Sequence, residues 1–251
     1  MSDTARHTYD LTLLDQSAAT WRQSPALRLI YGRLYARARQ LAQSGPALEI
    51  GSGIGVIKEF WPDIVTSDIA KTQYVDRAVS AYELDKTGPW ATIVAMDVLH
   101  HLTQPFQFFE SAARALEADG TLIIIEPAAT PWGKFLYQLC HHEPCKPKLL
   151  SPPFEFAADA NGEFANMGMA QSIFAQHQDH SNQRLQAIGL RVESVAYHDV
   201  IAYFLTGGFS KRLPTPTPLI AAISSLEDKL PNSCKAKLGT RMTLALRKLK
   251  P

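Results

Sequence analysis

The chain has 251 residues and a net charge of +1, and 46% of its residues are hydrophobic and 20% charged. These values exclude a chain that is disordered throughout, and the lack of an overall basic field argues against nucleic acid as a partner. The length is sufficient for one large core, so we expect a single elaborated α/β domain.

The cysteines and the N-terminal residues indicate the compartment. Cys140, Cys145 and Cys234 have no spacing typical of a disulfide framework. The first ten residues lack the apolar core of a signal peptide, and no apolar run reaches the length of a membrane span. We therefore expect a cytoplasmic protein without a membrane segment. Its oligomeric state has no signature in the sequence.

Both ends of the chain carry mainly basic side chains. Between Asp15 and Glu49 the only formal charges are arginines, and after Asp228 they are all lysines and arginines. Solvated helix faces explain this pattern, and so does a docking surface for an anionic or carrier-bound small-molecule acceptor. Both interpretations remain open.

An amphipathic helix is predicted near the N-terminus. Ser24 suits its N-cap, Pro25 its first turn and Gly45 its exit. Apolar residues recur on one face of this segment at helical spacing. We interpret residues 1–46 as a helical lid that covers a domain formed by residues 47–251.

From residue 46 onward, strand-like and helix-like segments alternate, as in a parallel sheet built from βαβ units. The predicted strands are 46–50, 63–68, 76–81, 90–97, 121–128, 191–204 and 239–249. The predicted helices are 55–60, 104–120, 179–190 and 219–230. The segment 129–176 is too long for a simple loop between two secondary-structure elements, so we expect an insertion with a functional role.

The segment LEIGSGIG, residues 48–55, ends a predicted buried strand in a glycine-rich turn. Such a turn exposes backbone to a ligand, although any tight strand-to-helix turn favours glycine. A dinucleotide site would have the pattern G-x-G-x-x-G, and here Val56 stands in the place of the third glycine. Glu49 precedes the turn, and a carboxylate favours an ammonium group over a pyrophosphate. Asp68 ends the next strand, where its carboxylate suits ribose hydroxyl groups.

In their order and spacing, these motifs resemble the cofactor site of class I S-adenosylmethionine-dependent methyltransferases. The likeness continues through VAMDVLHHL (94–102), FFESAARALEADG (108–120) and TLIIIEP (121–127), so it covers roughly the central third of the chain. The resemblance implies a Rossmann-like methyltransferase fold: a doubly wound, mostly parallel seven-stranded α/β sheet, here with an N-terminal helical lid and an insertion after strand five. The implied cofactor is S-adenosyl-L-methionine, with S-adenosyl-L-homocysteine as product.

The resemblance also implies roles for individual residues. The residues expected at the methionine end of the cofactor are Glu49, Gly51, Ser52 and Gly53. Asp68 would hold the ribose, Ile69 would pack on the adenine, and Asp97 would lie beside the sulfonium. Ser80 and Ala81 stand where such enzymes often have an acidic residue and its neighbour near the adenine amino group. Ser80 is not acidic, and residues 69–79 leave little room for the helix usually found there.

Three residues are candidates for contact with the methyl acceptor. His101 follows strand four at the carboxyl edge of the sheet, and histidine has a suitable pKa for a general base. The segment CHHEPC, residues 140–145, places His141 and Glu143 in the insertion, and we expect them to line the acceptor pocket. No second cluster with zinc-type spacing accompanies this segment, so we predict no metal.

We therefore expect methyl transfer to an oxygen or nitrogen of a small-molecule acceptor. One alternative is a non-catalytic S-adenosylmethionine-binding partner or scaffold protein. Another is an NAD-dependent oxidoreductase, which Glu49 and Val56 disfavour.

Overall fold

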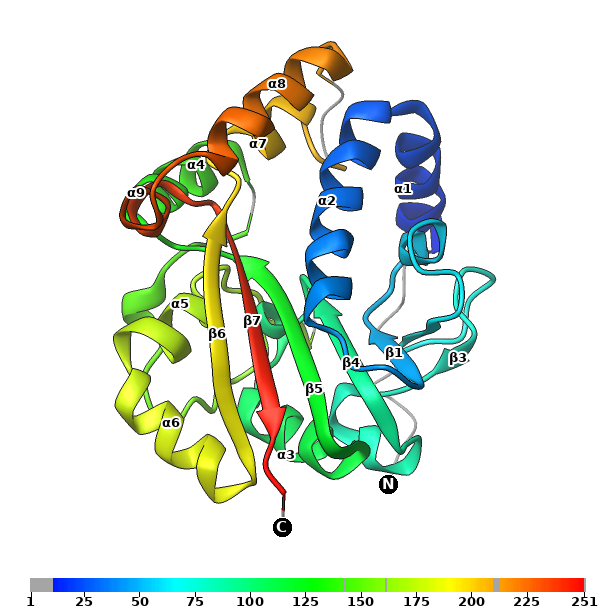
Figure 1. Ribbon diagram of the computed structural model, residues 1–251, viewed down its shortest axis with the longest axis vertical. Coiled ribbons are helices and arrows are strands. Elements are labelled where there is room, and N and C mark those ends of the chain that lie inside the picture. Colours follow the sequence, from blue (N-terminus) through cyan, green and yellow to red (C-terminus); the bar gives the residue numbers. More distant parts are fainter. Residues whose placement is uncertain (1–10, 142, 161, 210–212, 251) are drawn as a thin grey trace.

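The computed structural model describes residues 11–141, 143–160, 162–209 and 213–250. At its centre lies a seven-stranded sheet in the order β3-β2-β1-β4-β5-β7-β6 (Figure 1). The strands are β1 (Ala47–Ile50), β2 (Val65–Asp68), β3 (Arg77–Ala78), β4 (Trp90–Met96), β5 (Leu116–Pro127), β6 (Leu190–His198) and β7 (Arg241–Lys248). The strand pairs from β3 to β5 are parallel, and β7 is antiparallel to both β5 and β6. The predicted doubly wound, mostly parallel sheet is confirmed.

Helices cover both faces of the sheet (Figure 1). The α-helices are α1 (Leu11–Gln23), α2 (Pro25–Leu41), α3 (Pro105–Ala115), α4 (Pro131–Cys140), α5 (Met169–Gln171), α6 (Gln178–Ala187), α7 (Ala202–Thr206), α8 (Thr217–Asp228) and α9 (Asn232–Leu238). The short 3-10 helices are η1 (Val56–Glu59), η2 (Ala81–Lys86), η3 (Leu99–His101) and η4 (Pro147–Leu149), and η5 (Ser172–Gln176) is a π-helix. No helix in the described ranges is both long enough and apolar enough to span a membrane.

The core forms two layers because successive strand residues point to opposite faces of the sheet. Ile93 and Leu122 pack on one face in a cluster that includes residues of α3 and α6. Val94 and Ile123 pack on the other face with residues of α2. The central strands are therefore buried on both sides, as their continuous apolar runs predict.

Helix α2 forms as the sequence predicts and belongs to the second core layer. The Ser24 side chain accepts a hydrogen bond from the Leu27 backbone N–H at 3.3 Å, which caps the helix. Ile30 and Leu34 are fully buried against the sheet. The lid interpretation of residues 1–46 stays a prediction, and residues 1–10 lie outside the described ranges.

Several predicted boundaries are wrong. The helix expected to exit at Gly45 ends at Leu41, and the strand expected over 76–81 spans only Arg77–Ala78. The helix expected over 104–120 ends at Ala115, because Leu116 already pairs with Trp90 of β4. The strand expected over 191–204 ends at His198, where Asp199 has a left-handed φ of 52° and α7 follows. In the last two places tertiary pairing and backbone geometry override local propensity.

The sequence pattern does not predict α1 or α9. Helix α1 packs on its neighbours through its last turns, where Trp21 lies edge-on to Tyr31 with ring centroids 5.7 Å apart. Helix α9 has seven residues and buries none of them, so it has no apolar stripe to detect.

Candidate active site

The glycine turn after β1 has the tight backbone that its sequence predicts. Gly51 has a φ of +62°, and a Cβ atom there would lie 2.3 Å from Cγ2 of Val98. Gly53 has a φ of +51°, and a Cβ atom there would meet no protein atom within 4 Å. The first glycine is thus required by packing within the protein, whereas the second leaves open space beside the backbone.

Glu49 is a buried carboxylate at the end of β1, with an exposed fraction of 1%. The Tyr35 hydroxyl donates a hydrogen bond of 3.0 Å to its Oε1 atom. Its Oε2 atom is buried and has no hydrogen-bond partner among the described residues. Burial raises the pKa of Glu49 to about 7. The site therefore holds an acidic group that a cationic ligand would stabilise in its charged form.

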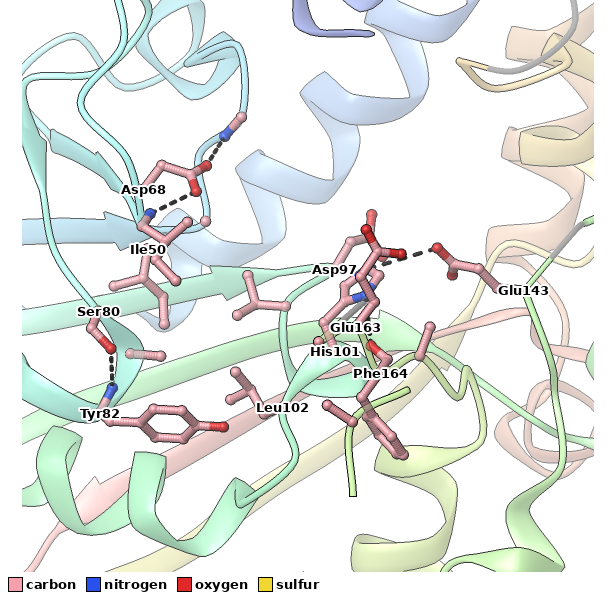
Figure 2. Close-up of a pocket in the computed structure, with 18 of the residues that line it drawn as sticks. Ile50, Asp68, Ser80, Tyr82, Asp97, His101, Leu102, Glu143, Glu163 and Phe164 are labelled. Carbon is pink, nitrogen blue, oxygen red and sulfur yellow. Dashed lines mark hydrogen bonds and ion pairs between the residues drawn. The ribbon is translucent and has the colours of Figure 1, made fainter. Parts of the chain in front are cut away.

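Asp68 ends β2 and connects it to the glycine turn (Figure 2). Its Oδ2 atom accepts a hydrogen bond from the Gly53 backbone N–H at 2.8 Å, and its Oδ1 atom accepts one from the Ile69 N–H at 2.7 Å. The adjacent Ile69 side chain is 58% exposed. A fixed carboxylate and an exposed apolar side chain thus lie next to each other beside the turn.

A cavity of about 960 Å³ lies at the carboxyl ends of β1, β2 and β4. Nine of the site residues predicted from the sequence line it: Gly51, Gly53, Asp68, Ile69, Ser80, Ala81, Asp97, His101 and Glu143. Glu49 and Ser52 are buried and do not line it. His141 is not a lining residue either; its Nδ1 atom accepts a hydrogen bond of 3.2 Å from the Glu143 backbone N–H.

The end of the cavity near β3 has Ser80 at the position where the resemblance implies an acidic side chain, and Ser80 directly precedes the 3-10 helix η2. The Ser80 hydroxyl accepts a hydrogen bond from the Tyr82 N–H at 3.3 Å and caps η2. Tyr82 itself lines the cavity, which the sequence analysis missed because the aromatic residue lies in no recognised motif. Residues 69–76 contain no helix, as the sequence predicts.

Asp97 lies at the end of β4 with a left-handed φ of 56°. The guanidinium group of Arg241, at the start of β7, binds both of its carboxylate oxygens, with Nη2 3.0 Å from Oδ2. Arg241 is fully buried and stacks over the Tyr203 ring at 4.7 Å. Sequence reasoning missed Arg241 because it lies 144 residues from its partner.

The opposite end of the cavity carries His101, from η3, and Glu143, from the segment that follows α4 (Figure 2). His101 Nε2 lies 3.9 Å from Glu143 Oε1. Burial lowers the pKa of His101, and the neighbouring His100 lowers it further. Although burial raises the pKa of Glu143, its contacts with His100 and His101 hold it at about 2.

Beneath this pair lies a buried histidine whose role the sequence does not reveal. His100 Nδ1 is 2.6 Å from Oε2 of Glu126, the residue before the end of β5. Burial alone lowers the pKa of His100, but the carboxylates of Glu126 and Glu143 raise it to about 10. Glu126 was not predicted as a site residue, although its place in TLIIIEP, at the carboxyl edge of a central strand, was a usable signal.

The wall of the cavity is acidic. Five carboxylate residues line it: Asp68, Asp97, Glu143, Asp159 and Glu163. No lysine or arginine in the described part of the chain lines it. Asp159, Glu163 and Phe164 belong to the insertion after β5, whose sequence contains no motif that marks them.

Comparisons with known proteins agree with this geometry. A family model described as a methyltransferase domain matches residues 21–195. No curated protein sequence matches the chain. The fold resembles a SAM-dependent methyltransferase from Archaeoglobus fulgidus, with 14% identity, a TM-score of 0.51, and coverage of 88% of this chain and 94% of that one.

Two further solved structures have lower TM-scores. A putative methyltransferase from Bacillus halodurans has 16% identity, a TM-score of 0.48 and coverage of 86% of this chain and 99% of its own. The 1,6-didemethyltoxoflavin-N1-methyltransferase from Burkholderia thailandensis, solved with S-adenosylhomocysteine, has 13% identity, a TM-score of 0.46 and coverage of 96% and 85%.

A sheet of this topology with a glycine turn and an acidic residue at the next strand end defines a class I methyltransferase fold. Because the family model spans more than half of the chain, the protein belongs to the methyltransferase-domain family, and its cofactor is S-adenosylmethionine. The residues present fit this cofactor: Gly53 leaves space beside the backbone, Asp68 and Ile69 line the same cavity, and the Glu49 carboxylate is buried directly behind the turn. The alternative of an NAD-dependent oxidoreductase is set aside.

Proposed function

We infer that the protein transfers a methyl group from S-adenosylmethionine to an oxygen or nitrogen of a neutral or positively charged small molecule. The observation that carries this proposal is the single cavity that extends from the glycine turn to His101 and Glu143. Donor-side and acceptor-side groups therefore lie in one cavity.

The size of the cavity favours a small acceptor. Pockets for small molecules and cofactors commonly measure about 300–1,000 Å³. At about 960 Å³, this cavity is at the upper end of that range. It has room for the cofactor and a compact second molecule, but not for a folded macromolecular domain.

The charge of the lining supports a neutral or cationic acceptor, with Asp97 paired to Arg241 and Glu143 in contact with His100. Carboxylates without lysine or arginine among the described lining residues disfavour an anionic ligand and stabilise a cationic or neutral one. This revises the anionic acceptor suggested by the basic ends of the sequence. Those basic side chains do not form the wall of the cavity.

In this proposal, one end of the cavity binds the cofactor and the other end binds the acceptor. The cofactor supplies an activated methyl group on a sulfonium. We assign Asp68 to its ribose and Ile69 to its adenine. Glu49, which is buried behind the glycine turn, is assigned to the charge of its ammonium group. Ser52 holds the turn, because its N–H donates to the Ser67 carbonyl at 2.9 Å. Ser80 and Ala81 line the end of the cavity that is assigned to the adenine.

On the acceptor side, His101 lines the cavity and is assigned as the base that takes the proton that the acceptor loses. Glu143 orients His101 and the acceptor. His141 supports this pair by ordering the backbone at Glu143, which revises its expected contact with the acceptor. Asp97, fixed by Arg241, borders the sulfonium.

The test is methyl transfer from labelled S-adenosylmethionine to metabolite extracts fractionated by charge. We expect label in the neutral or cationic fractions, and the variant His101→Ala should reduce the rate about 100-fold or more. His180→Ala, at an exposed histidine of α6, is the matched control and should retain the rate. Label confined to anionic fractions would contradict the acceptor class. S-adenosylhomocysteine binding with no labelled product in any fraction would favour the non-catalytic scaffold alternative.

Two further expectations remain proposals. The division into a helical lid over residues 1–46 and a domain over residues 47–251 stays a proposal, although α2 packs into the core. The cytoplasmic location rests on the composition of the sequence.

A further inference from the structure

Two histidines and a glutamate converge at the acceptor end of the cavity. His100 and His101 come from η3, and Glu143 comes from the insertion. One donor atom from each residue lies within 4.8 Å of the donor atoms of the other two. His100 Nε2 is 3.5 Å from Glu143 Oε2, and His101 Nε2 is 3.9 Å from Glu143 Oε1.

These separations are close to those within a metal coordination sphere. Imidazole nitrogens and carboxylate oxygens bind zinc at about 2.0–2.2 Å, so neighbouring ligand atoms in a tetrahedral site lie about 3.3 Å apart. The two separations, each to a different oxygen of Glu143, exceed this value by about 0.2 and 0.6 Å.

Both rings are oriented by their other nitrogen. His100 Nδ1 lies 2.6 Å from Glu126 Oε2, and His101 Nδ1 lies 3.3 Å from the Phe164 carbonyl oxygen. Carboxylates and backbone carbonyls are the usual partners of metal-binding histidines, because they fix the tautomer that leaves Nε2 free for the metal.

Glu126 is itself fixed in place. Its Oε1 atom accepts hydrogen bonds from the Val98 N–H at 2.8 Å and the Leu99 N–H at 2.7 Å. The orientation of His100 is therefore determined by strand β5 and the turn that follows β4. Such support is expected of a built site, whereas a chance contact between surface side chains lacks it.

A shared proton explains only part of this arrangement. A proton on His100 Nε2 can bond to Glu143, but it leaves the second imidazole nitrogen, that of His101, facing the same carboxylate without a bond between them. A dication interacts with all three donors at once. It also offsets the negative charge of the Glu126 and Glu143 carboxylates.

We propose that His100, His101 and Glu143 bind a divalent first-row transition-metal ion, with zinc as the best match to two imidazoles and one carboxylate. His101 and Glu143 line the cavity, so the remaining coordination position faces the acceptor. An oxygen or nitrogen of the acceptor can take that position, a step that rests on the proposed function. Because the metal uses the His101 Nε2 lone pair, it replaces the free base in the loaded protein.

The sequence predicts no metal because CHHEPC has no accompanying cluster at zinc-type spacing. The fold supplies that cluster from the LHH turn after β4. Cys140 and Cys145 take no part in the site.

Metal binding by the full chain tests the proposal directly. Chelator-treated protein is dialysed against Zn²⁺ or Co²⁺, the bound metal is measured by mass spectrometry, and the visible spectrum of the Co²⁺ form is recorded. We expect one ion per chain and the absorption bands of four- or five-coordinate Co²⁺. Glu143→Gln and His101→Asn should remove both signals.

Further variants separate ligands from supporting residues. Glu126→Gln should weaken metal binding by about 10- to 100-fold, the usual effect of losing a carboxylate behind a ligating histidine. His180→Asn and Glu155→Gln, at exposed positions, are matched controls that should bind as the wild type does. S-adenosylhomocysteine binding by every variant verifies that the fold and the donor site are intact.

Equal metal retention by the wild type and Glu143→Gln would overturn the proposal, and so would a wild type that binds no ion. Either result would indicate that His100 and Glu143 share a proton in place of a metal ion. These outcomes are distinct from failure of the proposed function, because metal content and S-adenosylhomocysteine affinity are measured without any methyl acceptor.

Discussion

At the scale of single residues, Glu49 is the clearest link between sequence and chemistry. Its place before the glycine turn indicates a cationic partner, and in the fold it is buried with one oxygen unpartnered. Burial without a counter-charge raises its pKa to about 7, so the free protein holds this residue partly protonated near neutral pH.

The affinity for S-adenosylhomocysteine should therefore depend on pH through Glu49. The ligand ammonium favours the carboxylate, so below pH 7 binding must release the Glu49 proton, and affinity should fall up to tenfold per pH unit. Above pH 7 the carboxylate is already formed and the dependence flattens. Calorimetry from about pH 5.5 to about pH 7.5 measures this, since the ligand ammonium stays largely protonated there.

Glu49→Gln should weaken binding at the upper pH and abolish the slope. Glu155→Gln, at an exposed position, should keep the wild-type slope. An unchanged slope in Glu49→Gln would show that another group carries the titration.

At the scale of elements, α2 combines a local signal with a tertiary role. Its cap and apolar stripe are readable from the sequence, whereas its packing against the sheet depends on the fold. The same helix presents the Tyr35 hydroxyl to Glu49, so packing of α2 also shapes the donor end of the site.

Leu34→Ala should destabilise the protein by about 2–5 kcal/mol, because Leu34 is fully buried between α2 and the sheet. Chemical denaturation monitored by circular dichroism measures this free energy of unfolding. The control, Leu226→Ala in α8, removes a leucine side chain that is 64% exposed and should change it by less than about 0.5 kcal/mol. Similar values for both variants would show that α2 is only loosely attached to the core.

At the scale of the whole molecule, the cavity exists only when β1, β2 and β4 end at one edge and the insertion closes over that edge. A ligand of this cavity therefore binds the folded state alone and stabilises it by mass action.

S-adenosylhomocysteine at about 100 times its Kd should stabilise the fold by about 2.7 kcal/mol. For a chain of this length, that corresponds to a rise in Tm of about 5–10 °C. Differential scanning calorimetry measures the shift, with NAD at equal concentration as the control that should leave Tm unchanged. A shift with NAD and none with S-adenosylhomocysteine would contradict the cofactor assignment.

The sequence by itself determined what depends on local pattern. Hydrophobic periodicity identified the central strands, and the backbone demands of a tight turn singled out Gly51 and Gly53. Strand ends placed Asp68, Asp97 and His101 at one edge, since parallel strands share their carboxyl edge. Periodicity did not locate the start of β5 or the end of β6, because strand pairing and one left-handed residue decide those boundaries.

Only the tertiary structure decided which distant groups meet. Arg241 reaches Asp97 across 144 residues, and Glu143, a candidate from the CHHEPC segment, meets the histidine pair only through the folding of the insertion. Such contacts depend on how segments pack, and the type and spacing of neighbouring residues do not encode that packing. The sequence therefore identified the methyl donor and named His101 and Glu143 as acceptor-side candidates, while the partners of these residues and the other carboxylates of the cavity wall became visible only when the chain was folded.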